Sequence, residues 1–295
     1  VRCGDFFCTK GGAWYLPNGE WVTYDTAHPS KRIRCIDLDR ARAIGGWRFA
    51  VATVQENQAG FARFASEQGA EFVVQVGNTG QRIDWDLDPA VISSSEMPIL
   101  GRGVVAHQEF DSDPDGAFGF SDPHYADRGI VRSFVNLIHR TPGSWEPFLS
   151  AEGRLVPDGF SFFAHGHEGR NGTVQPTSAI AYLMAGSGWG WHVKPVGDGF
   201  GHVIHNWAAI GRPLIGSSEY YRGKLAEPFW EDLVTCVDLS ARSLDETINL
   251  VREISSAPER HARMCYAIRE RFDSCVDYAR DEIAVRDLLG LAATG

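Results

Sequence analysis

The sequence predicts an α/β protein with two Rossmann-like domains and a helical C-terminal tail. Short apolar segments typical of strands alternate with amphipathic segments typical of helices along most of the chain. An acidic stretch with glycine and proline begins at Asp111 and is typical of a linker between domains. After Ser243 the pattern is helical only. We therefore expect an N-terminal domain at residues 1–127 and a C-terminal domain with closing helices at residues 128–295.

Length and charge limit the classes of function. A chain of 295 residues can form one large or two ordinary domains. Its formal net charge of −10 argues against a broad nucleic-acid-binding surface, although a local basic groove stays open. No apolar run approaches the ~18 residues of a membrane span, and no signal peptide is visible, so we expect a cytoplasmic protein. The first domain is short, which points to a reduced domain or to missing N-terminal residues.

The first domain begins with an aromatic, turn-rich segment and continues as alternating strands and helices. Residues 1–35 contain glycine turns between short extended runs, which predicts hairpin-like structure. The apolar runs that follow are continuous, as expected of a parallel sheet covered on both faces. The expected elements are a helix at 37–44, a strand at 47–54, a helix at 57–67, and strands at 71–76, 90–95 and 103–110.

The second domain repeats the alternation before its closing helices. Ile130, Phe134 and Ile138 lie at four-residue spacing and predict a helix at 129–139. Two Ser-x-x-Glu sequences, at Ser243 and at Ser256, predict capping boxes that start helices. The other expected elements are strands at 160–165, 189–195 and 233–239, a helix at 176–184, and a last helix at about 276–289.

The segment 198–215 is the most informative part of the chain. Its glycines predict a tight turn, followed by a helix at about 202–210 that Gly211 ends and by a strand from Arg212. A glycine turn at a helix start binds anions through free backbone N–H groups and the helix dipole. On the helix, Val203, Trp207 and Ile210 share the expected core face, and His202, His205, Asn206 and Ala209 the other. The backbone donors expected for a diphosphate are those of Gly199, Gly201, His202 and Val203.

This segment resembles the donor-site signature of GT-B glycosyltransferases, especially the retaining enzymes of family 4. That signature is Glu-Gly-Phe-Gly, four variable residues, then Glu-Ala-Met-Ala-Cys-Gly-x-Pro-Val-Ile. Asp198 stands at its first acid and Asn206 at its second. The residues that match in register are Gly199, Phe200, Gly201, Ala209, Gly211, Pro213 and Ile215.

The resemblance implies a fold and an activity. The two domains would face each other across a cleft, and the last helix would return to brace the N-terminal domain. The enzyme would move a sugar, with retention of configuration, from a UDP- or GDP-linked donor and would need no metal and no further cofactor. The resemblance also assigns Asp198 to the transferred sugar and Asn206 to the ribose hydroxyls of the nucleotide.

Further site residues are expected around this motif. Arg170 and Lys224 are candidate cations for the diphosphate, with unpaired surface charges as the alternative. His107 and Glu109 follow a strand end and are candidate catalytic groups on the acceptor side. A buried neutral His107 is the alternative. The pairs His165/His167 and His202/His205 lack a complementary carboxylate, so no metal site is expected.

Three function classes remain open from the sequence. The leading one is a glycosyltransferase, whose acceptor could be a glycan, a small molecule, a protein or modified DNA. A nucleotide-sugar epimerase or hydrolase could use the same two-domain architecture. A sugar-nucleotide-binding protein without catalysis is the third, because Asp198 and Asn206 differ from the two glutamates of the signature.

Overall fold

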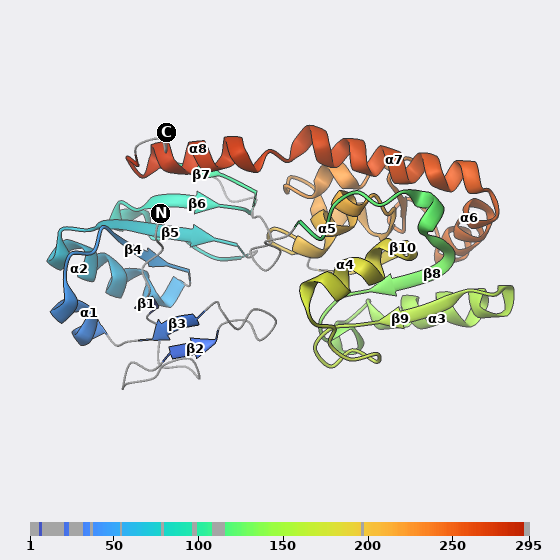
Figure 1. Ribbon diagram of the computed structural model, residues 1–295, viewed down its shortest axis with the longest axis horizontal. Coiled ribbons are helices and arrows are strands. Elements are labelled where there is room, and N and C mark those ends of the chain that lie inside the picture. The colour runs from blue at the N-terminus through green and yellow to red at the C-terminus, as the bar shows by residue number, and fades with distance from the viewer. Residues whose placement is uncertain are drawn as a thin grey trace. The chain divides into compact units, whose positions relative to one another are not determined.

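The computed structural model describes residues 6–7, 21–23, 32–35, 38–53, 55–77, 80–95, 99–107, 116–195 and 198–291 (Figure 1). It divides into two compact units, of which one is Val1–Ala106 with Ala279–Gly295 and the other is His107–Tyr278. Each unit contains a parallel sheet with helices. The predicted α/β class with two parallel sheets is therefore confirmed.

The first unit is built on a parallel sheet of four strands whose order in space follows the chain. Helix α2 packs on β4 and β5, and Phe64 of the helix is buried against Phe72 and Val74 of the sheet. The strands are β4 (Phe49–Ala52), β5 (Glu71–Val76), β6 (Ala90–Ser93) and β7 (Gly103–Val105), and the helices are α1 (Leu38–Ile44) and α2 (Gln58–Gln68).

Two further parts belong to the first unit. A small sheet places β3 (Arg32–Cys35) between β1 (Phe6–Phe7), which is parallel to it, and β2 (Trp21–Thr23), which is antiparallel. The glycine turns expected to form hairpin-like structure lie outside the described residues. The last helix, α8 (Tyr278–Leu288), reaches this unit as well (Figure 1). Arg102, beside β7, donates to the carbonyl of Leu288 (3.3 Å) at the end of α8.

The second unit is built on a five-stranded parallel sheet in the order β12-β11-β10-β8-β9. All six residues of β10 are buried, because the strand has neighbours on both sides and helices on both faces. The strands are β8 (Asp127–Ser133), β9 (Ser161–Ala164), β10 (Ser187–His192), β11 (Leu214–Gly216) and β12 (Cys236–Asp238).

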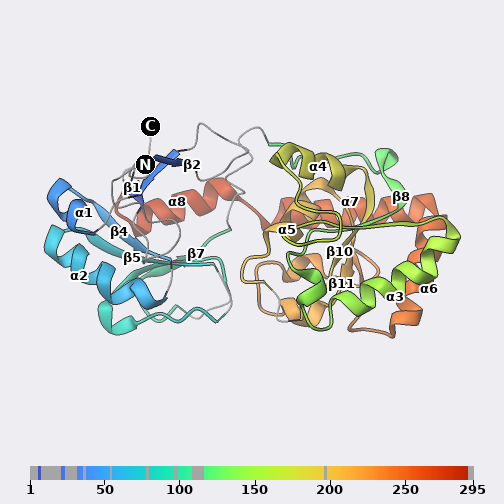
Figure 2. The same ribbon diagram turned by 90° about the horizontal axis from the view of Figure 1, so that it is seen from below.

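Helices cover both faces of this sheet, with α3 and α4 on opposite sides of the strands in Figure 2. One core joins the strands to α3 and α6 through Phe148, Trp189 and Ile248. The other joins them to α4, α5 and α7 through Met184 and Trp207. The helices are α3 (Trp145–Leu155), α4 (Thr177–Ala185), α5 (His202–Ile210), α6 (Leu244–Ser256) and α7 (Pro258–Cys275).

The predicted helix at 129–139 is wrong, because this segment forms strand β8 and then an irregular turn. Ile130 and Val131 are β-branched and favour a strand, and Val131 is fully buried in the sheet core. Ile138 lies instead in a short 3-10 turn whose preceding residue, Leu137, has a positive φ of 55°. The four-residue apolar spacing thus arises from a strand and a turn. Helix α3 was not predicted.

The first predicted capping box is confirmed and the second is wrong. The Ser243 hydroxyl accepts from the Glu246 backbone N–H, and the Glu246 carboxylate accepts from the Ser243 backbone N–H. Ser256, by contrast, is the last residue of α6, and its hydroxyl donates to the Glu253 carbonyl (2.7 Å). Helix α7 starts instead with Pro258, a residue favoured in the first helical turn.

The division between the units falls earlier than the expected boundary after residue 127. Residues 107–127 belong to the second unit, where Phe118 is buried in the core with Trp207. Arg212, which is fully buried, donates to the carbonyl (2.8 Å) and the hydroxyl (3.0 Å) of Ser121. These contacts attach the predicted linker to the second unit.

None of the helices in the described ranges is both long enough and apolar enough to cross a membrane.

The fold predicts opposite effects for the same substitution at two glycines. A Cβ at Gly190 of β10 would lie 2.7 Å from the Trp207 ring, whereas one at Gly153 of α3 would meet nothing within 4 Å. We expect Gly190→Ala to lower the free energy of unfolding by about 1–3 kcal/mol, because the tryptophan must shift. Gly153→Ala should raise it by about 0.5–1 kcal/mol, since alanine favours the helix. Urea unfolding of both variants tests this, and equal stability of the two would contradict it.

Candidate active site at the start of helix α5

Strand order in the second unit predicts where a ligand would bind. From β8 the chain passes to β9 on one side, and then crosses to β10 on the other side of β8. In open parallel sheets ligands bind outside the carboxyl ends of the strands at such a switch point. The carboxyl end of β10 is His192, and the segment that follows it leads to Asp198 and α5. The predicted motif therefore lies at the topologically expected place.

Helix α5 has the predicted bounds because a glycine in the left-handed region stands at each end. Gly201 is the N-cap with φ 82°, and Gly211 is the C-cap with φ 81°. The carbonyl of Gly201 accepts from the N–H groups of Ile204 (3.0 Å) and His205 (3.1 Å). The first N–H groups of an α-helix have no acceptor within the helix, so this end can receive an anion.

The structure corrects two details of the motif. A Cβ on Gly201 would point toward Ile204, Ala226 and Asp198, at 3.3–3.9 Å, so backbone conformation rather than ligand approach requires this glycine. The helix is also buried on more than one face. His205 and Ala209 were expected opposite the core, yet both are buried, while Val203 is only partly buried.

Asp198 is held by three side chains from nearby elements. The Nε2 atom of His192 lies 2.9 Å from its Oδ2 atom, and the ammonium of Lys194 binds its Oδ1 atom. The hydroxyl of Tyr221 donates to Oδ2 at 3.4 Å. His192 and Tyr221 are fully buried, whereas the Asp198 side chain keeps 20% of its surface exposed. The carboxylate is thus fixed in position and still open to a ligand.

These partners keep Asp198 ionised. Burial by itself raises the pKa of the carboxyl, but the hydrogen bonds and electrostatic interactions with His192 and Lys194 outweigh this effect. The pKa of Asp198 therefore lies well below its usual range, and the group is an anion at neutral pH. His192 and Lys194 are not predicted from the sequence, although their i, i+2 spacing in an extended segment places them on one side.

His205 is the neutral counterpart of Asp198. Burial lowers the pKa of the His205 imidazole to about 3. Its Nδ1 atom lies 3.0 Å from the Gly201 carbonyl, which can only accept, so Nδ1 carries the proton. Nε2 is then a bare acceptor, and it has no hydrogen-bond partner among the described residues. The Phe200 ring stacks on this imidazole with ring centres 4.0 Å apart.

His107 lies beside this pair of rings. Its ring centre is 5.7 Å from that of His205 and 6.2 Å from that of Phe200. The predicted site residue is therefore next to the α5 turn, although β7 ends at Val105, before the predicted strand end. Glu109, the second predicted group on the acceptor side, lies outside the described residues.

The two predicted cations differ in their surroundings. Lys224 is buried, and its ammonium lies 5.7 Å from the centre of the Tyr221 ring, which places it near the Asp198 cluster. Arg170 instead forms two 2.7 Å hydrogen bonds to the carboxylate of Glu152 on α3 and one to the Phe162 carbonyl. These contacts engage Arg170 in fixing its loop to α3, and they give its predicted donor-binding role no support.

A buried cation that the sequence does not predict lies on β8. Arg132 donates to Nε2 of His165 (2.6 Å), and no carboxylate of the described residues lies within ion-pair distance of it. Burial lowers the pKa of Arg132 to about 10. The neutral His165 stacks on Phe134, which contacts Trp207 of α5. Arg132 therefore brings positive charge to the strand beside the switch point.

Asn206 completes the motif. It lies one turn inside α5 and is partly exposed. No hydrogen bond joins its amide to the rest of the described chain, in contrast to Asp198. An amide can both donate to and accept from a hydroxyl, so Asn206 is available to a polar ligand.

Comparison with solved structures shows a similar fold in HepE, in TarM and in an alpha-glucosyltransferase. HepE of Anabaena, in complex with UDP and glucose, matches with a TM-score of 0.62 and 14% identity over 86% of this chain and 79% of its own. An alpha-glucosyltransferase in complex with UDP and DNA matches with a TM-score of 0.63 and 11% identity over 87% and 85%. TarM matches with a TM-score of 0.61 and 10% identity over 82% and 54%. No protein-family profile and no curated protein sequence matches this chain.

The burial of His205 predicts a dependence of stability on pH. The folded imidazole has a pKa of about 3 and the unfolded one a pKa of about 6.5, so only the unfolded state binds a proton between these values. The free energy of unfolding should fall as the pH is lowered through this window, by up to about 1.4 kcal/mol per pH unit for one histidine.

His205→Leu should flatten this dependence, as measured by urea unfolding between pH 7 and pH 4.5. His261 supplies a comparison, because burial lowers the pKa of its imidazole to about 4. His261→Leu should flatten the slope separately, and the two effects should add. An unchanged slope in His205→Leu would show that this imidazole becomes protonated in the folded protein.

Proposed function

We propose that the protein is a GT-B-type glycosyltransferase that moves a sugar from a nucleotide-sugar donor to an acceptor hydroxyl. The observation that carries this proposal is the geometry at the switch point. There the anionic Asp198 lies beside a helix start that Gly201 fixes, and Asn206 lies one turn farther on. The folds of HepE and the alpha-glucosyltransferase, both solved with UDP, support a uridine diphosphate donor.

Each part of the site has a role in this reaction. The N-terminal end of α5 would receive the diphosphate, whose negative charge grows as the sugar departs. Arg132 on β8 and Lys224 in the segment after β11 are buried cations that can offset this charge. Asn206 would bind the ribose hydroxyls. Asp198, held by His192, would contact the hydroxyls of the transferred sugar.

The transfer is proposed to retain configuration, as in family 4 enzymes. In that chemistry the leaving phosphate can accept the proton of the acceptor hydroxyl. The neutral imidazole of His205 cannot donate a second proton, and its Nε2 is buried with no hydrogen-bond partner among the described residues. His107, whose ring centre lies 5.7 Å from that of His205, would contact the sugar or the acceptor. The alpha-glucosyltransferase was solved in complex with DNA. The net charge of −10 of the present chain favours an uncharged acceptor over DNA.

Thermal unfolding with a panel of nucleotides tests the donor class. UDP, UDP-glucose, GDP and GDP-mannose would each be added in excess to the whole chain. A ligand at 100 times its dissociation constant should add about 2.7 kcal/mol to the free energy of unfolding. We expect stabilisation by UDP and UDP-glucose. Absence of any shift across the panel would overturn the proposal, and turnover of UDP-glucose without transfer to an acceptor would favour a hydrolase.

Substitution of Asn206 should weaken the nucleotide. In Asn206→Ala the ribose loses one hydrogen-bonding group, so UDP and UDP-glucose should each bind about 1–3 kcal/mol less tightly. Titration calorimetry measures both affinities. Asn249→Ala, in α6 and away from the motif, is the matched control and should bind both ligands like the parent. Unchanged affinities in Asn206→Ala would remove the ribose assignment.

Substitution of Asp198 should act on the sugar and not on the nucleotide. Asp198→Asn keeps the shape of the side chain but removes the charge that meets the sugar. We expect turnover of UDP-glucose to fall at least about 100-fold, while the affinity for UDP, which has no sugar, stays within a factor of about three. Asp158→Asn, an exposed ion-paired site, is the control. Parental turnover in a folded Asp198→Asn protein would show that Asp198 only supports the turn.

A further inference from the structure

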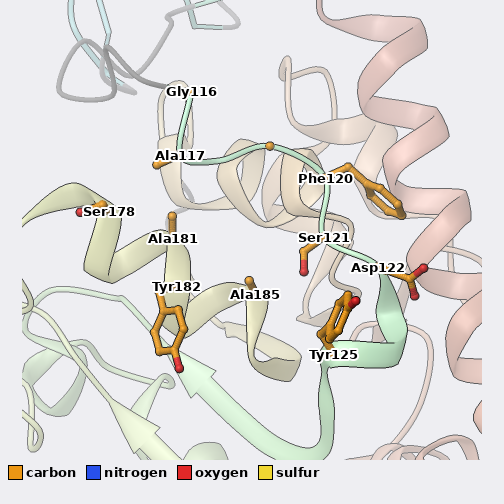
Figure 3. Close-up of a pocket in the computed structure, with 11 residues that line it drawn as sticks. Gly116, Ala117, Phe120, Ser121, Asp122, Tyr125, Ser178, Ala181, Tyr182 and Ala185 are labelled. Atoms are coloured by element: carbon orange, nitrogen blue, oxygen red, sulfur yellow. The ribbon is translucent and has the colours of Figure 1, made fainter.

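A second groove, separate from the α5 turn, lies in the same unit. It has a volume of about 510 Å³ and runs between helix α4 and the segment 116–125 (Figure 3). On α4, Ser178, Ala181, Tyr182 and Ala185 face it at the i, i+3, i+4 and i+7 spacing of one helix face. None of the residues that line it belongs to the Asp198 cluster or to α5.

Two tyrosines stand almost free in solvent on the walls of the groove. Tyr182 rises from α4 and Tyr125 from the opposite segment, with Ala185 between them in the view of Figure 3. Their side chains are 78% and 79% exposed, the largest fractions among the exposed large apolar and aromatic residues of the described chain. Two exposed aromatic rings on one groove offer apolar surface to a ligand, whose binding would remove that surface from water.

The groove is preformed because a buried arginine fixes both walls. Arg212 has no exposed surface, and its Nε and Nη2 atoms donate to the Ala185 carbonyl of α4 at 3.0 and 2.6 Å. Its Nη1 atom donates to the Ser121 carbonyl of the opposite wall at 2.8 Å. A charged group that spans the two walls holds their separation, so a ligand would not have to order them.

The chemistry of the lining selects the class of ligand. Asp122 and Ser178 are exposed and offer oxygen atoms for hydroxyl groups, and the tyrosines offer flat apolar rings with polar ends. The described lining itself contains no lysine or arginine. The nearby Arg212 and Arg269 already donate to backbone carbonyls, and Arg269 also to the Asp273 carboxylate, so a phosphate or a nucleic acid would meet the negative charge of Asp122. The groove is open to solvent, so it would not enclose a lipid chain.

We propose that this groove binds a neutral oligosaccharide. A sugar ring has an apolar C–H face that fits an exposed tyrosine ring, and hydroxyls at its edge that match Asp122 and Ser178. Two tyrosines on opposite walls suit a chain of several sugar units rather than a single sugar. The proposal does not depend on the donor chemistry at α5, and it adds a second carbohydrate site to the same unit.

Titration calorimetry of the whole chain with maltohexaose, cellohexaose and chitohexaose tests the proposal. At least one of them should bind, and binding should weaken about tenfold in Tyr182→Ala and in Tyr125→Ala, because each loses one stacking ring. Tyr182→Phe should keep most of the affinity, since the ring remains. Leu149→Ala on α3, which removes an exposed side chain that does not line the groove, should bind like the parent.

Further arms separate this site from the proposed donor site. Saturating UDP should not displace the oligosaccharide, and Tyr182→Ala should bind UDP like the parent. A failure of UDP to bind would contradict the proposed function, whereas the oligosaccharide titration would still test the groove proposal. No binding of any of the three probes, an affinity equal to the parent's in both alanine variants, or displacement by UDP would each overturn the groove proposal. Both tyrosines are exposed, so neither variant should fail to fold.

Discussion

The packing of Trp207 on Gly190 is the constraint on which the second unit depends. The indole is fully buried, and it occupies the space that any side chain at Gly190 would take. This contact fixes α5 at close range over β10, whose backbone is held on both sides by β8 and β11. Since β10 ends at His192 and α5 starts at His202, the connecting turn has both ends fixed. The position of Asp198 follows from that closure.

Asp198 and His205, two largely buried groups at this turn, have different charge states. Asp198 is an anion because the nearest groups are donors, namely His192, Lys194 and Tyr221. His205 is neutral because its nearest polar partner is a carbonyl and its other neighbours are rings. In a site of low dielectric each ionisable group takes the form that its partners stabilise. The arrangement puts one negative charge at the helix start and keeps the adjacent imidazole from adding a positive one.

Local chemistry was predictable from the sequence, and long-range partners were not. Both ends of helix α5 could be predicted from the sequence, because Gly201 and Gly211 readily adopt the left-handed conformation found at each end. Strand β8 was mistaken for a helix because its apolar residues have a helical spacing, and only pairing with β9 and β10 decides between the two. Likewise Arg170 could not be told from a free cation, since its partner Glu152 belongs to a helix that the pattern did not reveal.

Arg212 connects the α5 turn to the groove between α4 and the segment 116–125 through hydrogen bonds to the backbone. It follows α5 directly, and it donates to the Gly211 carbonyl (3.1 Å) at the end of that helix as well as to Ala185 and Ser121. Burial of a guanidinium is costly unless its N–H groups are satisfied, and here carbonyl oxygens take that part. The Arg212 side chain therefore holds the C-terminal end of α5 and both walls of the groove between α4 and the segment 116–125. The two walls are far apart in sequence, and this arginine is one of the groups that join them.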